Sequence, residues 1–371
     1  TLHSQNATGE IVVDGARIDL LSPDLSFTTS PLLANTGDIT LSNGADVRAL
    51  ATGAGLAENA TFRLEGIQTS FTGHRFDAAE SPGSTGSIEV ALNSSLNLAQ
   101  GLIIGQEGNG DLTVNSGGSV SSQDLLVAVF GTSTSSVLVA DAGSQVTVND
   151  ALLLGGNNAG NFGGNATFTV ENGGAVSVAN NTKFLTFSSS LTIDGGTLET
   201  NTIEERAIVS GNISISDPGG GSALTVGTSD GSSTFRGLIQ DAAGGAGSIK
   251  KVGSGLLTLT GANTFTGGML HQGGGLQLEN NAAAGTGTIT AAGGTFLTLG
   301  AGLDITNAID LQSDLLITTT GNATHSGVIS GAGNLTKSQS TTLTLLGNNT
   351  FTGGVDLNAG TLAIGNDSAL G

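Results

Sequence analysis

The chain has 371 residues, with 61 glycines, four prolines and no cysteine, and its 30 acidic and 10 basic side chains give a formal charge of −20. This sign excludes a nucleic-acid-binding surface, and the lack of a Gly-X-Y period excludes collagen. Without disulfides, the fold depends on packing and backbone hydrogen bonds alone. No stretch is apolar enough to span a bilayer, so we expect no direct membrane insertion by this segment.

Residues 1–85 are interpreted as the start of a β-solenoid, because DITLSNGADV at 38–47 reads as a strand, a glycine turn and a second strand. The segment 71–83, FTGHRFDAAESPG, is more charged than its surroundings and contains a proline. We expect it to form a loop that protrudes from the solenoid. Four of its side chains are candidates for a surface contact, although a solvated loop is favoured over a catalytic or metal-binding role: His74, Arg75, Asp77 and Glu80.

Residues 86–216 repeat a strand, a glycine turn and a second strand. The repeated units are DLTVNSGGSV (111–120), VLVADAGSQV (137–146), TFTVENGGAV (167–176) and SLTIDGGTL (190–198). Their apolar residues alternate with period two, which places them on one face of a strand. Glycine pairs supply the positive φ that tight corners need. No segment shows a convincing helical period, so the sequence predicts an all-β region.

Residues 217–371 form a third region, which opens on a candidate junction, DPGGGS at 217–222. Within it, LTLTGANTFTGGMLHQGGGLQL (257–278) recurs about 86 residues later as LTLLGNNTFTGGVDLNAGTLAI (343–364). The chain is expected to stop inside a further copy. Two matching sets of residues are predicted to form the corner and core of the repeat: Asn263, Phe265, Gly267 and Gly268, and Asn349, Phe351, Gly353 and Gly354.

A repeat that contains strands but no helix can bury its apolar face only by stacking on its neighbours. The sequence therefore predicts a parallel β-helix, in which each turn lays short strands in register with those of the turn below. Leucine, valine, isoleucine and phenylalanine would point inward, and threonine and serine outward. Lys251 and Lys337 occupy equivalent positions, which favours a structural role. His271 and His325 lie near the edges of repeats and are expected to face outward.

The two copies at 257–278 and 343–364 resemble the passenger-associated transport repeat of bacterial autotransporters. The resemblance covers about residues 234–371. It implies a right-handed parallel β-helix that is exported by type V secretion and lies outside the cell or on the bacterial outer-membrane surface. The family's transmembrane β-barrel is not expected within this chain.

The chain lacks the motifs of several other functions. It has no GDSGS-like serine nucleophile, no Walker pattern, no GGxGxD nonapeptide and no EF-hand loop. Basic residues are too sparse for the uronate chemistry of polysaccharide lyases. We therefore expect no enzyme activity and no cofactor, while the negative charge permits weak surface Ca²⁺ binding.

The expected function is that of a non-catalytic surface passenger in adhesion, self-association or the building of a biofilm or extracellular layer. Its partners would be a host or matrix surface, or identical chains. One alternative is a subunit of an extracellular filament or sheath that assembles through solenoid ends or faces. A second alternative is a polysaccharide-cleaving β-helix enzyme.

Overall fold

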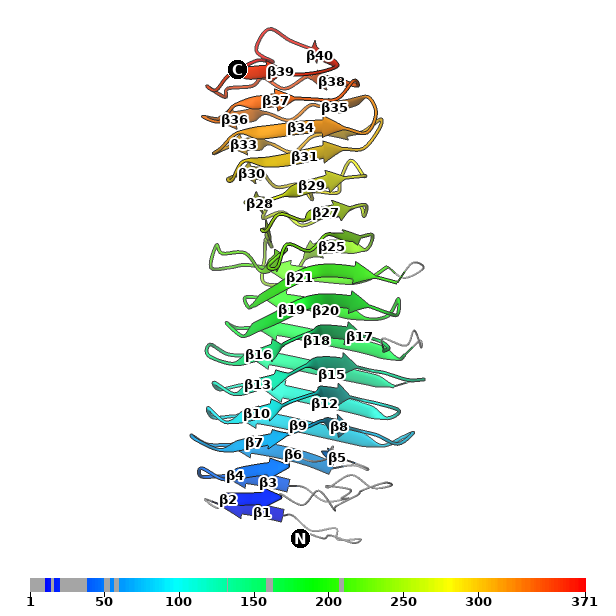
Figure 1. The fold of residues 1–371 in the computed structure, drawn as a ribbon, viewed down its shortest axis with the longest axis vertical. Coiled ribbons are helices and arrows are strands. Elements are labelled where there is room, and N and C mark those ends of the chain that lie inside the picture. The colour runs from blue at the N-terminus through cyan, green and yellow to red at the C-terminus, as the bar shows by residue number, and fades with distance from the viewer. Residues whose placement is uncertain are drawn as a thin grey trace. The chain divides into compact units, whose positions relative to one another are not determined.

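The computed structural model describes residues 11–14, 17–20, 39–49, 54–56, 60–131, 133–157, 163–206 and 210–371. These residues form strands and turns without any helix, and the parallel strands stack as a β-solenoid (Figure 1). The predicted all-β solenoid is thereby confirmed. None of the described segments is a helix capable of crossing a membrane. The chain divides into two compact units, residues 1–198 with 206–211 and residues 199–205 with 212–371.

The described strands of unit 1 form three faces of parallel strands. One is formed by β1 (Ile11–Asp14), β3 (Ile39–Ser42), β6 (Ala60–Glu65), β9 (Thr85–Ala91), β12 (Asn109–Val114), β15 (Thr134–Ala140), β18 (Asn165–Glu171) and β20 (Ser190–Asp194). A second is formed by β2 (Arg17–Leu20), β4 (Asp46–Ala49), β7 (Ser70–Gly73), β10 (Ser95–Leu98), β13 (Ser119–Ser122), β16 (Gln145–Val148) and the first half of β19 (Ala175–Phe184). A third is formed by β5 (Ala54–Leu56), β8 (Phe76–Ala78), β11 (Gly101–Ile104), β14 (Asp124–Val127), β17 (Ala151–Leu154) and the second half of β19.

Unit 2 begins in β21 (Thr197–Glu205), of which residues 199–205 belong to it, and contains β22 (Asn212–Ser216) paired with β25 (Leu238–Asp241). A central face is built from β23 (Leu224–Val226), β26 (Ile249–Lys251), β28 (Met269–His271), β30 (Ile289–Ala291), β33 (Ile309–Leu311) and β36 (Ile329–Gly331). A second face is built from β24 (Ser233–Phe235), β27 (Leu256–Leu259), β29 (Gly275–Leu278), β31 (Thr295–Leu299), β34 (Leu315–Thr319), β37 (Leu335–Lys337) and β39 (Val355–Leu357). A third contains β32 (Asp304–Ile305), β35 (Ala323–His325), β38 (Thr342–Leu345) and β40 (Thr361–Ile364).

The core of each unit consists of ladders of inward side chains. In unit 1, register pairing stacks Phe62 on Ile88, Ile88 on Leu112 and so on through Val137, Phe168 and Leu191, and all of them are at most 1% exposed. In unit 2 the series Leu257, Leu276 and Leu297 is stacked in the same way. Because every turn buries its apolar face on the next, the ladder provides the main hydrophobic stabilisation.

The expectation that residues 71–83 form a protruding loop is wrong. Phe71 lies in β7 and Phe76 in β8, and both side chains are at most 1% exposed. With Phe62 they form an aromatic cluster, whose ring centroids are 5.0 to 5.9 Å apart. Of the charged residues that suggested a loop, Asp77 is the outward residue of β8 and Glu80 lies in the turn after it. His74 and Arg75 form the short bend between the two strands. Between β7 and β9, only the bend at 74–75 and residues 79–84 lie outside the strands.

Candidate functional site

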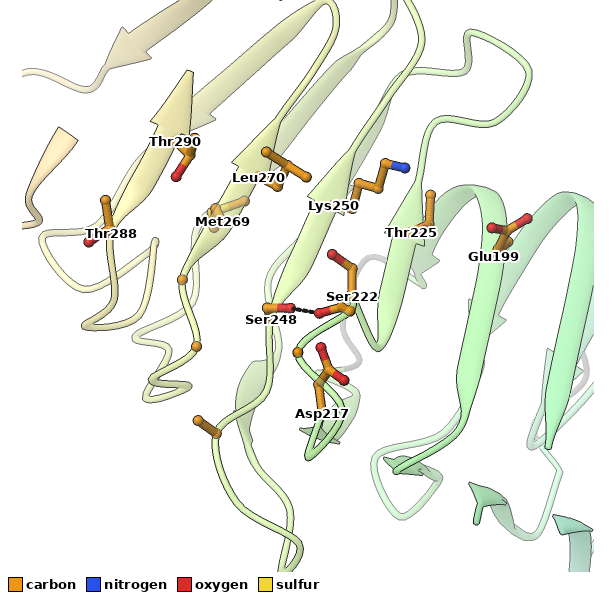
Figure 2. Close-up of a pocket in the computed structure, with 15 residues that line it drawn as sticks. Glu199, Asp217, Ser222, Thr225, Ser248, Lys250, Met269, Leu270, Thr288 and Thr290 are labelled. Atoms are coloured by element: carbon orange, nitrogen blue, oxygen red, sulfur yellow. Dashed lines mark hydrogen bonds between the residues drawn. The ribbon is translucent and has the colours of Figure 1, made fainter. Parts of the chain in front are cut away.

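A groove of about 680 Å³ lies on the central face of unit 2 (Figure 2). Its floor consists of outward side chains from neighbouring parallel strands. Register pairing places Thr225 of β23 beside Lys250 of β26, Lys250 beside Leu270 of β28, and Leu270 beside Thr290 of β30. Alternation along each strand directs the flanking residues into the core. The ladder therefore presents an amine, an aliphatic side chain and two hydroxyls in one row.

The segment 217–222, which the sequence marked as a junction, forms a wall of this groove. The Gly220 amide donates to the Asp217 carbonyl over 3.1 Å, and φ at Gly220 is +76°, so the chain turns sharply here. The Ser248 hydroxyl donates to the Gly221 carbonyl over 2.8 Å and ties the turn to the sheet. Asp217 is thereby held at the edge of the groove, as Figure 2 shows.

Three charged side chains line the groove. Glu199 comes from β21, Asp217 from the wall and Lys250 from the floor. Within the described part of the chain, none of these side chains makes a hydrogen bond or ion pair. The groove therefore offers one free ammonium donor and two free carboxylate acceptors beside its hydroxyls. Its lining contains no histidine next to a hydroxyl, which is the pairing that nucleophilic catalysis uses.

The described residues contain no group of three or more His, Cys, Asp or Glu side chains arranged to hold a metal ion. The groups that line the groove are suited to hydrogen bonding and to apolar contact. Its sequence signal was hidden, because the floor residues are separated by a whole turn of the chain and meet only once the register is known.

The predicted corner asparagines are buried and connect successive turns. The Asn263 side chain accepts the Ile239 amide proton over 2.8 Å and donates to the Ala283 carbonyl over 2.6 Å. Asn349 repeats this pattern with Ile329 and Ala369, over 2.7 and 2.6 Å. In each case, one amide side chain satisfies a buried backbone donor in the preceding turn and a buried acceptor in the following one.

A third buried asparagine, Asn307, was missed by the sequence analysis. Its side-chain nitrogen donates to the carbonyls of Gly285 and Gly287 over 3.1 and 2.8 Å. The NTFTGG context that marks the other two corners is absent around it. Its spacing of about two turns from both Asn263 and Asn349 was the available signal.

The remaining residues of the motif lie in or beside the core. Phe265 is 0% and Phe351 3% exposed. A Cβ atom on Gly267 would lie 2.5 Å from the Gly247 carbonyl oxygen, so only glycine fits there. Gly268 has a φ of +85°, and the Gly354 amide donates to the Asn334 side chain over 2.7 Å. Gly353 lies against the backbone of the turn at Gly333.

Both repeat lysines are buried and their ammonium groups bind carbonyl oxygens. Lys251 donates to the carbonyls of Val252, Gly253 and Gly273 over 2.5 to 3.2 Å. Lys337 donates to those of Ser338 and Gln339 over 2.6 and 2.9 Å. Burial lowers the pKa of both amines, and the charge of Asp230 opposes this for Lys251. These lysines hold corners of the solenoid, in contrast to Lys250, which faces the groove.

The expectation that His271 and His325 face outward is wrong. Both side chains are 0% exposed. Each is the third residue of a three-residue strand whose first residue is buried, so period two also directs the third inward. Nε2 of His271 lies 3.2 Å from the Gly274 carbonyl and Nε2 of His325 lies 3.0 Å from the Asn307 carbonyl. Among the described residues, neither Nδ1 atom has a hydrogen-bond partner.

The four charged candidates of the segment 71–83 belong to unit 1, whereas the groove belongs to unit 2. Arg75 donates to Asp77 over 2.7 Å. Burial raises the pKa of Asp77 against the opposing effect of Arg75. Burial and the charge of Asp77 raise the pKa of Glu80. The His74 carbonyl accepts the Gln100 amide proton over 2.7 Å. Arg75 and Asp77 thus form a partly buried ion pair. A ligand contact by any of the four residues stays a prediction.

Comparison with known proteins identifies the repeats. The family described as "Passenger-associated-transport-repeat" matches residues 249–278 and 335–364. The "Adhesin BmaC autotransporter" of Brucella suis biovar 1 (strain 1330) is 34% identical over 137 residues, which covers 37% of this chain and 4% of that protein. No solved structure matches.

Fold and repeats together define the class of protein: a β-solenoid that carries passenger-associated transport repeats. The comparisons confirm the resemblance to autotransporter passengers that the two NTFTGG segments indicated. The chain spans only a small part of the length of the adhesin that it matches.

Proposed function

We propose that this chain is a non-catalytic, surface-exposed passenger segment that acts in adhesion. The observation that carries the proposal is the similarity to an autotransporter adhesin, together with the two transport repeats. Export to the surface agrees with the absence of cysteine, because no disulfide can close a loop during threading through a membrane. It also agrees with the acidic charge, which opposes non-specific binding to anionic membranes.

The outer faces of the solenoid support a contact role. Outward positions carry hydroxyls and carboxylates in rows, such as Thr298 beside Thr318, with hydroxyl oxygens 2.7 Å apart, and Ser136, which donates to Asp111 over 2.6 Å. Such faces form many weak hydrogen bonds, whose sum along an extended contact is large. Self-association of identical chains, and through it a biofilm or extracellular layer, is the form of adhesion that this chemistry favours.

Adhesion and self-association are tested with purified chain coupled to beads. We expect coated beads to adhere to matrix-coated glass and to clump with one another, and beads coated with heat-unfolded chain to do neither. Coated beads that behave like the unfolded control in both assays would contradict the proposal. Electron microscopy of the soluble chain separates the filament alternative, which requires continuous fibres rather than individual particles.

A further inference from the structure

We propose that the groove of unit 2 binds a neutral oligosaccharide. The inference deepens the proposed adhesive function, and rests on it, by naming the class of ligand at one site. The groove offers a ligand side-chain groups and no free backbone groups of the sheet. The backbone of the floor is already paired in the parallel ladder of β23, β26, β28 and β30. A ligand on this face therefore meets side chains, and cannot add to the sheet as a peptide strand does at an edge.

The second support is the charge of the groove. Lys250 contributes one positive charge, and Glu199 and Asp217 contribute two negative charges. The groove is thus slightly negative in a chain of formal charge −20, which opposes anionic ligands. The central ammonium in turn opposes cations. A neutral ligand rich in hydroxyls satisfies all three groups, because a hydroxyl can accept from the ammonium and donate to a carboxylate in charge-assisted hydrogen bonds.

The third support is the shape of the groove and its hydroxyls. Lining residues come from β21, β23, β26, β28 and β30. At about 4.8 Å between neighbouring strands, this row extends over about 19 Å, which suits a chain of sugar units better than a single sugar. Thr225 and Thr290 add hydroxyls near the two ends of the row, and Leu270 offers an aliphatic surface to the C–H face of a sugar ring (Figure 2).

The lining contains no aromatic side chain, so binding at one groove lacks ring stacking. We therefore expect a dissociation constant on the order of millimolar for a single chain. Many copies on one surface would raise the effective affinity for a polysaccharide, because each further contact is intramolecular. The assay must therefore present either the protein or the sugar in many copies.

The test uses the whole chain on beads against immobilised dextran, mannan and β-glucan, with alginate and heparin as acidic polysaccharides. We expect retention on at least one neutral polymer and none on the acidic ones. Lys250→Met and Glu199→Gln should each weaken retention at least about tenfold, the loss expected for one charge-assisted hydrogen bond. Thr336→Val and Asp310→Asn, which change outward residues that do not line the groove, should leave it unchanged.

Unfolding midpoints of all variants are measured in parallel, so that a loss of retention is interpreted only for folded protein. Retention on acidic polymers alone, on no polymer, or equally for wild type and both groove variants would overturn the inference. If wild-type beads still adhere to matrix-coated glass in that case, the adhesive function stands without this ligand. If they bind sugar but do not adhere, the adhesive function fails and the groove assignment stands.

Discussion

Acidification from pH 6.5 to pH 4 is expected to destabilise unit 2 by about 3 kcal/mol for each of its two buried histidines. Burial, aided by the charge of Lys251, lowers the pKa of His271 to about 4, and burial lowers that of His325 to about 4. The unfolded chain takes up these protons near pH 6.5, so it binds more protons than the folded chain across this interval. Stability is therefore full above pH 6.5 and is lost as the pH falls towards 4.

The measurement is hydrogen exchange, resolved to unit 2, at pH 7, 5.5 and 4.5 after correction for intrinsic exchange rates. The control is the double variant His271→Leu with His325→Leu, since leucine occupies the position of His271 in the second repeat copy, at residue 357. The double variant should lose the pH dependence between 6.5 and 4.5. An unchanged dependence in this variant would assign the effect to other groups.

Replacing Gly268 by alanine is expected to destabilise unit 2 by about 2–5 kcal/mol, the sum of left-handed backbone strain and overpacking. Its φ is +85°, and an added Cβ would lie 2.5 Å from the Thr288 carbonyl oxygen of the following turn. The overlapping atom is backbone, so relief requires two turns of the solenoid to move apart. The decrease in the free energy of unfolding is measured by denaturant titration, with circular dichroism as the probe.

Gly302→Ala is the matched control for this variant. Gly302 also has a left-handed backbone, with φ of +76°, but nothing lies within 4 Å of a Cβ atom built on it. The control variant therefore has the backbone strain without the overpacking. Its free energy of unfolding is expected to fall by about 1–2 kcal/mol. Equal destabilisation by the two substitutions would show that close stacking of turns contributes nothing at Gly268.

The fold was predictable because each turn repeats the same local pattern. Alternation such as Leu112–Val114 fixes which side chains face inward, and glycine pairs fix where the chain turns. The same alternation explains the failure at 71–83. Asp77 is the outward residue of β8 next to the buried Phe76, and Arg75 donates to it from the bend before the strand. This charge therefore lies on the outer side of the turn, whereas composition alone suggested a loop.

The candidate groove could not be predicted from the sequence, for a different reason. Thr225, Lys250, Leu270 and Thr290 are about one turn apart in the chain, and turns differ in length. Their adjacency depends on the register between strands, which a one-residue slip would destroy. The buried histidines were within reach, because counting by two from Met269 places His271 inward. Their position near the edges of repeats suggested exposure, but the period of two within the strand decides the direction.

Parallel stacking of successive turns in register is the central claim, and cysteine cross-linking tests it most directly because the chain has no cysteine of its own. Thr258 in β27 and Gln277 in β29 are register partners, and Thr298 in β31 is the next one along. Neighbouring strands are about 4.8 Å apart, within the Cα separation of a disulfide, whereas two spacings are not. Mild oxidation should cross-link the pair Thr258→Cys with Gln277→Cys and leave the pair Thr258→Cys with Thr298→Cys reduced. Equal cross-linking of both pairs, or preference for the second, would contradict the stacked register.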